Sequence, residues 1–270
     1  MLRRGLDRAI ALLASVVVLG FFRSVQVWGR SRIPEDRPVL LVINHFNGFV
    51  DPVIVVKVLG RLPRLLGKAT LWDIVPLRPV LALGGVIPVY RQRDGDTAGN
   101  VRSFAKAEAA LRHGGTVAIF PEGTTHDEPR LAEVHTGAAR IALGARAEGA
   151  EGLAIVPIGL AFDDKLALRS RAFARVGEPI LLDEVLDPAV DDSDREAVRS
   201  LTEQVAARLQ TVSPEFEDRY EHGALSMAAE VVLREPGTDR SEQVSFAERE
   251  SLASRLAREP DDERKEVIEA

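Results

Sequence analysis

His45 and Asp51 are the two residues of this chain whose types and spacing could most clearly support catalysis. They stand in the apolar stretch INHFNGFVDPV (43–53), and the chain holds only five histidines. A neutral imidazole can take a proton from a hydroxyl near neutral pH, and a carboxylate on its other ring nitrogen fixes the tautomer and stabilises the imidazolium; such a base contributes about 10²–10⁴ in rate. A structural interpretation also fits, because Asp51 before Pro52 is a good helix N-cap and His45 could bond to local backbone.

No protein nucleophile accompanies this pair. The chain has no cysteine, and the G-x-S-x-G pattern of nucleophilic serines does not occur in it. The reacting hydroxyl could therefore belong to a substrate, which predicts direct group transfer to an alcohol. The lack of cysteine also excludes disulfides and cysteine metal sites, and it fits a reducing, cytoplasmic setting.

Two further stretches place polar groups directly after apolar runs. FPEGTTHDEP (120–129) turns tightly at Gly123 with Glu122 at its tip, and a glycine there lets backbone N–H groups approach an anion. GGVIPVYR (84–91) ends on Arg91, a side chain suited to bidentate contact with phosphate. Singly, each stretch could be an ordinary turn or a solvated charge. Together with the histidine and aspartate above, they predict one polar site at the ends of several strands.

Apolar runs of strand length alternate with helical patterns between residues 33 and 182. Predicted strands cover residues 39–44, 64–68, 86–90, 116–120, 153–162 and 172–177, and predicted helices cover 52–59, 71–83, 100–113 and 137–149. This alternation predicts an α/β core over 33–182, with a mixed, largely parallel sheet flanked by helices. In such sheets ligands bind beyond the carboxyl ends of the strands, where the motifs above fall.

The first 32 residues differ in charge from the rest of the chain. Six arginines against one aspartate give them a net charge of +5, which leaves −11 for the remainder. Ala9–Phe22 is an apolar run of 14 residues, shorter than the roughly 20 that a spanning helix needs. Arg23, Trp28 and Arg30 suit a membrane interface, although a soluble core helix or a signal peptide are alternatives. We expect a membrane-associating helix over 1–32 with an anionic membrane surface as partner, and no nucleic-acid partner for the acidic remainder.

Beyond about Leu182 the sequence becomes highly charged. Helical patterns over 194–209 and 244–258 are joined by proline and glycine residues, Gly223 among them. The sequence therefore predicts a helical, charged C-terminal appendage over 183–270.

Four motifs together resemble a known family. NH…D (44–51), GVIPVYR (85–91), FPEGT (120–124) and IVPIG (155–159) resemble, in this order and spacing, the lysophosphatidate and glycerol-3-phosphate acyltransferases over roughly residues 35–180. The resemblance implies transfer of a fatty acyl group from an acyl-CoA or acyl carrier protein thioester to a hydroxyl of a phosphorylated glycerol, in phospholipid biosynthesis. It implies no metal or redox cofactor. Because family members commonly sit on membranes through N-terminal helices, it also implies a membrane-associated protein, which we expect on the cytoplasmic face.

The same resemblance implies roles for individual residues. His45 would be the base that deprotonates the acceptor hydroxyl, and Asp51 would orient it. The acceptor site would contain Arg91 on the phosphate, with Glu122, Gly123 and Thr124 beside it, while Pro157 would shape the acyl or acceptor pocket. Four basic residues could add phosphate contacts or form a solvated basic strip: Lys68, Lys165, Arg169 and Arg171.

One departure from the family pattern concerns the first motif. The usual spacing is His-x4-Asp, whereas five residues, Phe46–Val50, intervene here, and Gly48 could absorb the extra one. This spacing, with TGAARIAL and DDKLALRSRA, resembles a branch similar to glycerol-3-phosphate and dihydroxyacetone-phosphate acyltransferases. Glycerol-3-phosphate is therefore the predicted acceptor, and lysophosphatidate is the alternative. An inactive lipid-binding relative and a hydrolase are weaker hypotheses, because the site residues are present and nothing in the sequence would place a water.

Overall fold

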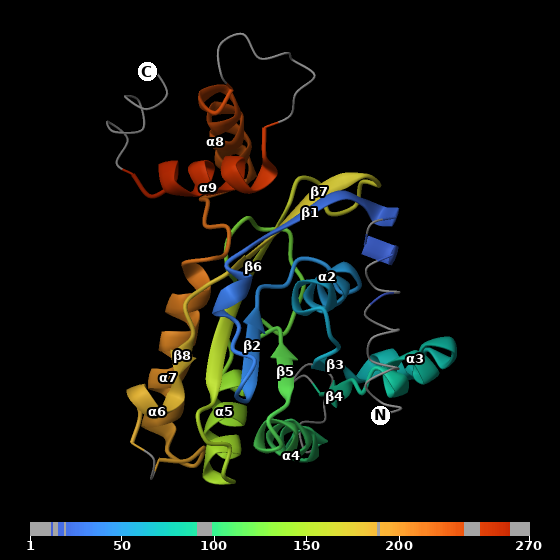
Figure 1. Ribbon diagram of the computed structural model, residues 1–270, viewed down its shortest axis with the longest axis vertical. Coiled ribbons are helices and arrows are strands. Elements are labelled where there is room, and N and C mark those ends of the chain that lie inside the picture. Colours follow the sequence, from blue (N-terminus) through green and yellow to red (C-terminus); the bar gives the residue numbers. More distant parts are fainter. Residues whose placement is uncertain are drawn as a thin grey trace.

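A mixed β-sheet forms the centre of the molecule (Figure 1). The computed structural model describes residues 12, 16–18, 20–90, 99–187, 190–234 and 244–259. Within them, eight strands follow the order β1-β7-β6-β2-β5-β3-β4, with β8 beside β6. Their bounds are β1 Phe22–Trp28, β2 Val39–Ile43, β3 Arg64–Lys68, β4 Ile87–Val89, β5 Thr116–Ile119, β6 Ala154–Phe162, β7 Ser170–Val176 and β8 Ile180–Leu181.

The central strands of the sheet are parallel. β6, β2, β5, β3 and β4 pair in parallel, whereas β7 and β8 run antiparallel to β6, and β1 runs parallel to β7. The predicted α/β fold with a mixed, largely parallel sheet is therefore confirmed. All six predicted strands are present. β2 and β6 are apolar throughout and buried almost completely, as suits strands that are covered on both faces.

Helices cover both faces of the sheet. The alternation of β2 decides which face each residue meets: Val39, Leu41 and Ile43 pack with α2 (Val50–Leu59), whereas Leu40 and Val42 face the other layer. That second layer consists of α4 (Gly99–Arg112), α5 (Gly137–Ala147) and α7 (Arg195–Gln210). The parallel strands therefore lie between two apolar layers, which fixes their register and the direction of the loops at their ends.

The segment after β3 is helical but interrupted, as its two prolines predict. It forms two 3₁₀ turns, Ala69–Asp73 and Val75–Leu77, and the short helix α3 (Arg78–Leu83). Figure 1 shows α3 projecting to one side of the sheet. Several of the apolar side chains of this segment are exposed.

The N-terminal segment differs from the helix expected over residues 1–32. Residues 1–11, 13–15 and 19, which make up much of that expected helix, lie outside the described residues. Val18 is helical and buried against the core, but the chain then enters the sheet as β1. Val25 and Val27 pack on the core, while Gln26 between them bonds to Ser245 and Ala247. This alternation is that of a strand and lies within the range expected to form the separate N-terminal helix. Among the residues described, no helix has the length and apolar character needed to cross a bilayer.

The C-terminal third divides differently from the expected appendage over 183–270. After the single turn α6 (Leu182–Val185), α7 begins with Asp194 capping its first N–H groups and buries Val198, Leu201 and Val205 on the sheet. α7 therefore belongs to the core layer. Among the described residues, α8 (Arg219–Val232) and α9 (Phe246–Leu256) pack on each other, and α9 also contacts β1 and β7 at the end of the molecule (Figure 1).

Candidate active site

The sheet brings His45 and Glu122 together. β2 and β5 are parallel neighbours in which Val42 pairs with Ile119. His45 and Glu122 each follow three residues after these partners, so both stand at the carboxyl edge of the sheet, where open α/β sheets place ligands. Both residues are buried, with 8% and 2% of their surfaces exposed.

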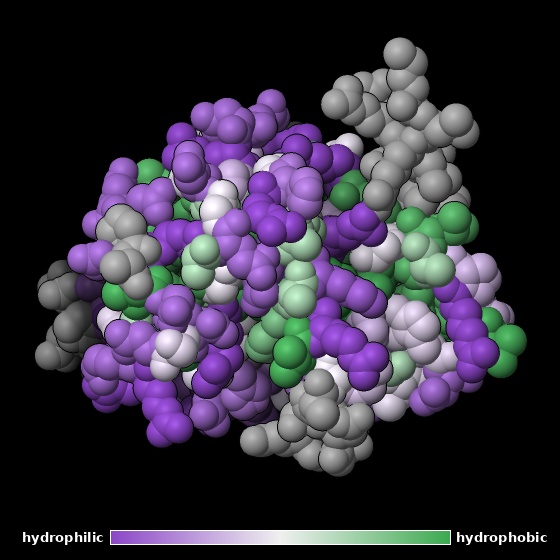
Figure 2. Space-filling model, turned by 90° about the horizontal axis from the view of Figure 1, so that it is seen from below, coloured by the Kyte–Doolittle hydropathy of each residue, from purple (hydrophilic) through white to green (hydrophobic). Residues whose placement is uncertain are grey.

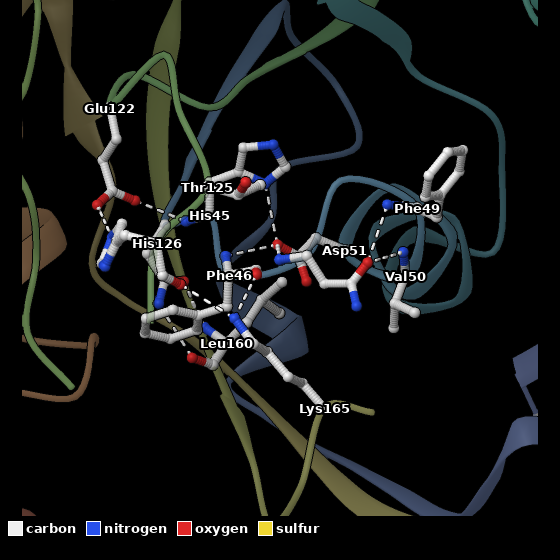
Figure 3. A network of polar contacts seen from close by, with 12 residues as sticks. His45, Phe46, Phe49, Val50, Asp51, Glu122, Thr125, His126, Leu160 and Lys165 are labelled. Carbon is white, nitrogen blue, oxygen red and sulfur yellow. Dashed lines mark hydrogen bonds and ion pairs between the residues drawn. The ribbon is translucent and has the colours of Figure 1, made fainter. Parts of the chain in front are cut away.

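His45 and Asp51 form a buried pair (Figure 3). His45 Nδ1 lies 2.9 Å from Asp51 Oδ2, and Asp51 is completely buried. Since a carboxylate only accepts hydrogen bonds, Nδ1 carries the proton and donates it. Nε2, on the other side of the ring, is then the nitrogen that can accept a proton from a ligand.

Asp51 also organises the loop that precedes it. Its Oδ2 accepts the N–H groups of Phe46 and Asn47 at 2.8 and 2.7 Å. The expectation that Asp51 is the N-cap of the following helix is wrong, because α2 begins earlier and Asp51 lies in its first turn. Asn47 serves this end of the helix instead, with Oδ1 accepting from Phe49 and Val50.

The environment of Asp51 opposes its ionisation. Burial raises the pKa of the Asp51 carboxyl, and the hydrogen bonds from His45, Asn47 and Phe46 counteract that effect. Its second oxygen, Oδ1, is buried without a hydrogen-bond partner among the described residues. Burying a carboxylate in this way costs stability. The attraction between the Asp51 carboxylate and the His45 ring offsets that cost most when the ring is positively charged.

Glu122 points into the protein, which differs from the expectation that it faces an acceptor. Figure 3 shows it directed at the backbone of His45 and the ring of His126. Oε1 accepts the His45 N–H at 2.6 Å, and Oε2 accepts from Ala132 N at 2.7 Å and lies 2.5 Å from His126 Nε2. These bonds use both oxygens of a carboxylate whose side chain is fully buried.

The tight turn after β5 is as predicted. Gly123 has φ of +64°, a left-handed conformation that L side chains rarely adopt, and its N–H bonds to Phe120 O. Thr124 follows, half-buried, with its hydroxyl directed at Thr125 O. The rings of Phe120 and His45 stack with centroids 4.1 Å apart, so this turn also packs against the imidazole.

The remaining predicted residues are distributed unevenly around this edge. Arg91 lies outside the described residues. Lys68 ends β3 at the same edge and is half-buried. Pro157 is inside the sheet, paired with Val42, so it lies below the edge rather than on it.

Three basic residues in and after the β6–β7 connection have different surroundings. Lys165 Nζ donates to the carbonyls of Phe46 and His126 and forms an ion pair with Asp127. Arg171 is paired with Asp163, and Arg169 is exposed. The basic strip that the sequence indicates is therefore partly committed to contacts within the protein.

Two residues of the site were missed by sequence reasoning. Asn44 is buried and exchanges two hydrogen bonds with the backbone of Leu160, which ties the end of β2 to β6. His126, in the loop after β5, bonds to Glu122. Its position four residues after Glu122 was the available signal, but a turn sequence does not reveal which way either side chain points. Among the residues described, no group of His, Asp and Glu side chains is arranged to hold a metal ion.

A cavity of about 490 Å³ lies elsewhere in the fold. It is lined by residues that include Arg30, Ile33, Val58 and Arg61. These residues surround the amino-terminal ends of β2 and β5, so the cavity opens at the edge opposite His45.

Comparison with family models shows which family this chain belongs to. Residues 24–161, half of the chain, match the family model described as Acyltransferase, and the chain belongs to this family. It is 37% identical over 44% of its length to glycerol-3-phosphate O-acyltransferase 2 of Saccharomyces cerevisiae, and 29% identical over 58% of its length to the chloroplastic 1-acyl-sn-glycerol-3-phosphate acyltransferase LPAT1 of Arabidopsis thaliana.

These alignments cover only part of the relatives. They span 16% of the yeast protein and 42% of the plant protein. Among solved structures, the 1-acyl-sn-glycerophosphate acyltransferase PlsC of Thermotoga maritima matches with a TM-score of 0.57 at 19% identity, covering 77% of this chain and 80% of that one. The likeness to PlsC establishes a common fold.

Proposed function

We propose that this protein transfers a fatty acyl group from an acyl-CoA or acyl carrier protein thioester to a hydroxyl of glycerol-3-phosphate. The observation that carries the proposal is the buried His45–Asp51 pair, whose Nε2 is left to accept a proton. The chain has no cysteine to form an acyl-enzyme. Direct transfer between the two substrates is therefore the simplest reaction for this site.

In the proposed reaction, His45 carries one proton from the acceptor hydroxyl to the leaving thiolate. Nε2 takes the proton of the acceptor hydroxyl as its oxygen attacks the thioester carbonyl carbon, and the carbonyl electrons move to oxygen. When the tetrahedral intermediate collapses, the C–S bond breaks and the thiolate takes the proton from the imidazolium. Asp51 stabilises that imidazolium, an arrangement worth about 10²–10⁴ in rate.

Two observations favour glycerol-3-phosphate over lysophosphatidate as the acceptor. The yeast relative that is 37% identical bears the glycerol-3-phosphate name, and the His-x5-Asp spacing resembles the corresponding branch. A small acceptor must be held by its phosphate and hydroxyls. We propose that Arg91 binds the phosphate and that Lys68 is a second candidate for this contact. The plant relative and PlsC favour lysophosphatidate as the second candidate.

A side-by-side assay tests the activity and the acceptor. Purified protein with acyl-CoA should esterify glycerol-3-phosphate with a higher kcat/KM than lysophosphatidate, and His45→Ala should lower kcat by about 10² or more. The reverse order of kcat/KM would replace the acceptor while retaining the reaction. Wild-type activity in a folded His45→Ala variant would disprove the mechanism.

We further propose that the protein works on the cytoplasmic face of a membrane with anionic lipid. Figure 2 shows hydrophobic side chains gathered on the side of the molecule where Figure 1 places α3. Val75, Val80 and Leu83 are 66%, 63% and 60% exposed there, beside the exposed Arg78. This segment leaves the sheet at the same edge as His45, so a bilayer against it would lie close to the proposed site.

A further inference from the structure

Lys165 is fully used by contacts within the protein. It lies in the connection between β6 and β7, and its Nζ donates to Phe46 O at 2.8 Å and His126 O at 3.1 Å and pairs with Asp127. An ammonium group has three N–H donors, and three acceptors occupy them. A phosphate ligand would therefore have to displace one of these partners.

Those partners belong to two different loops. Phe46 directly follows His45 in the loop after β2, whereas His126 and Asp127 lie in the loop after β5. The ring of His126 packs edge-on against Phe46, with centroids 5.3 Å apart. Lys165 thus joins the two loops through their backbone carbonyls at the place where their side chains already touch (Figure 3).

A second connection between the same loops runs through Glu122, which His126 holds. Its Nε2 lies 2.5 Å from Glu122 Oε2, and the other oxygen of Glu122 accepts the N–H of His45 at 2.6 Å. His126 Nδ1 is buried without a partner among the described residues, so its proton belongs on Nε2, where Glu122 accepts it. The backbone of His45 is therefore held by a carboxylate that His126 itself holds.

We propose that Lys165 and His126 are positioning residues that hold His45 in its reactive geometry, and that Lys165 is not a ligand of the acceptor phosphate. This inference rests on the proposed function of His45 as general base. A base acts only when its nitrogen lies within hydrogen-bond reach of the hydroxyl, and a displacement of about 1 Å can lower the rate by roughly 10²-fold. Contacts of this kind between the two loops keep the residues of the site in their relative positions.

Lys165→Met separates positioning from phosphate binding. Methionine keeps the apolar stem but removes all three donors. The positioning role predicts that kcat falls by about 10- to 10²-fold with little change in KM for the acceptor. A phosphate ligand would instead show a raised KM with kcat nearly intact, and that result, or no effect at all, would overturn the proposal. Lys106→Met, at an exposed site on α4, is the matched control and should behave as wild type.

Two substitutions of His126 test the second connection. Glutamine can place its amide nitrogen near the position of Nε2 and restore a bond to Glu122, whereas leucine cannot. His126→Gln should keep most of kcat, and His126→Leu should lose it by about tenfold or more without a matching rise in KM. Equal kinetics for the two variants would show that the bond to Glu122 does not position His45.

Amide hydrogen exchange provides a measurement that does not depend on activity. The N–H groups of His45, Phe46 and Asn47 bond to Glu122 and Asp51. Exchange in a peptide covering 44–49 should speed up in Lys165→Met and His126→Leu but not in Lys106→Met. Faster exchange without detectable acyl transfer in the wild type would contradict only the proposed function, whereas unchanged exchange in folded variants would contradict the positioning role.

Discussion

The 2.9 Å contact between His45 Nδ1 and Asp51 Oδ2 forms across five intervening residues. The longer spacing does not separate the pair, because Asp51 lies in the first turn of α2 and its carboxylate turns back toward the loop. There it also binds two N–H groups of the intervening residues. The extra residue needs no special backbone at Gly48, where a Cβ would meet only Thr125 Cγ2 at 4.0 Å.

Asp51→Asn should separate catalysis from stability. Asparagine can keep an oxygen for the backbone N–H groups, so the loop and helix start should persist. It cannot supply a negative charge to the imidazolium, so kcat should fall by about 10²–10⁴. Because burial raises the pKa of the Asp51 carboxyl, its neutral replacement should leave Tm unchanged or higher. A large loss of Tm with near-normal kcat would favour a purely structural role.

The glycine of IVPIG should be required for packing. A Cβ on Gly159 would lie 1.9 Å from Val212 O and 2.3 Å from Val212 C, so strand β6 and the segment after α7 would have to separate. Gly159→Ala should lower the free energy of unfolding by roughly 1–3 kcal/mol or more.

Gly223, inside α8, has no atom within 4 Å of an added Cβ. Gly223→Ala should instead stabilise by about 0.5–1 kcal/mol. Thermal unfolding of both variants checks the contrast, and a stable Gly159→Ala protein would contradict it.

The sequence predicted the core strands because fully apolar runs bounded by turns have few other uses. It failed at β1, where an apolar run of helical length leads directly into Val25-Gln26-Val27, and at α8, where Gly223 suggested a joint. At the site, the types and spacing of His45 and Asp51 indicated a pair, but they left a helix cap and a local backbone contact as alternatives, and the contact is seen only in the fold. The direction of Glu122 was not predictable, because it depends on His126 and Ala132, whose approach is set by the packing of a whole loop.

Glu108 on α4 should make stability depend on pH. Burial, with the nearby charges of Glu148 and Asp192, raises the pKa of Glu108 from 4.5 to about 7. The unfolded chain then loses this proton near pH 4.5 while the native protein keeps it until about pH 7. The native state binds more protons across that window, so the free energy of unfolding falls as pH rises through it and then levels off.

Glu108→Gln is the variant that checks this pH dependence. Glutamine cannot ionise, so the variant should match the wild-type Tm near pH 4.5 and exceed it above about pH 7. Glu151→Gln, at an exposed turn, is the control and should follow the wild-type profile. Parallel wild-type and Glu108→Gln profiles across the window would exclude Glu108 as the cause.

The exposed apolar side chains of the α3 segment should contribute to membrane binding. Full burial of one such side chain is worth about 1.5–3 kcal/mol. Replacing Val75, Val80 and Leu83 with serine should therefore lower partitioning onto anionic vesicles by about 10² or more, and sedimentation with vesicles measures it. Because salt screens the attraction between Arg78 and anionic lipid, the partitioning of the wild type should also weaken as salt increases.

The control for this membrane test lies on α8. Met227 and Val231 are 67% and 73% exposed but stand at the other end of the molecule, so Met227→Ser with Val231→Ser should bind vesicles as the wild type does. Equal binding by the α3 variant and the wild type would reject this surface. A truncation that tests the N-terminal residues separately should begin no later than Val17, because Val18 packs on the core and β1 starts at Phe22. A protein beginning near Ser31 would lack an entire strand of the sheet. If that truncated protein and the α3 variant each lose part of the binding, and the two losses add as free energies, the two segments bind the bilayer independently.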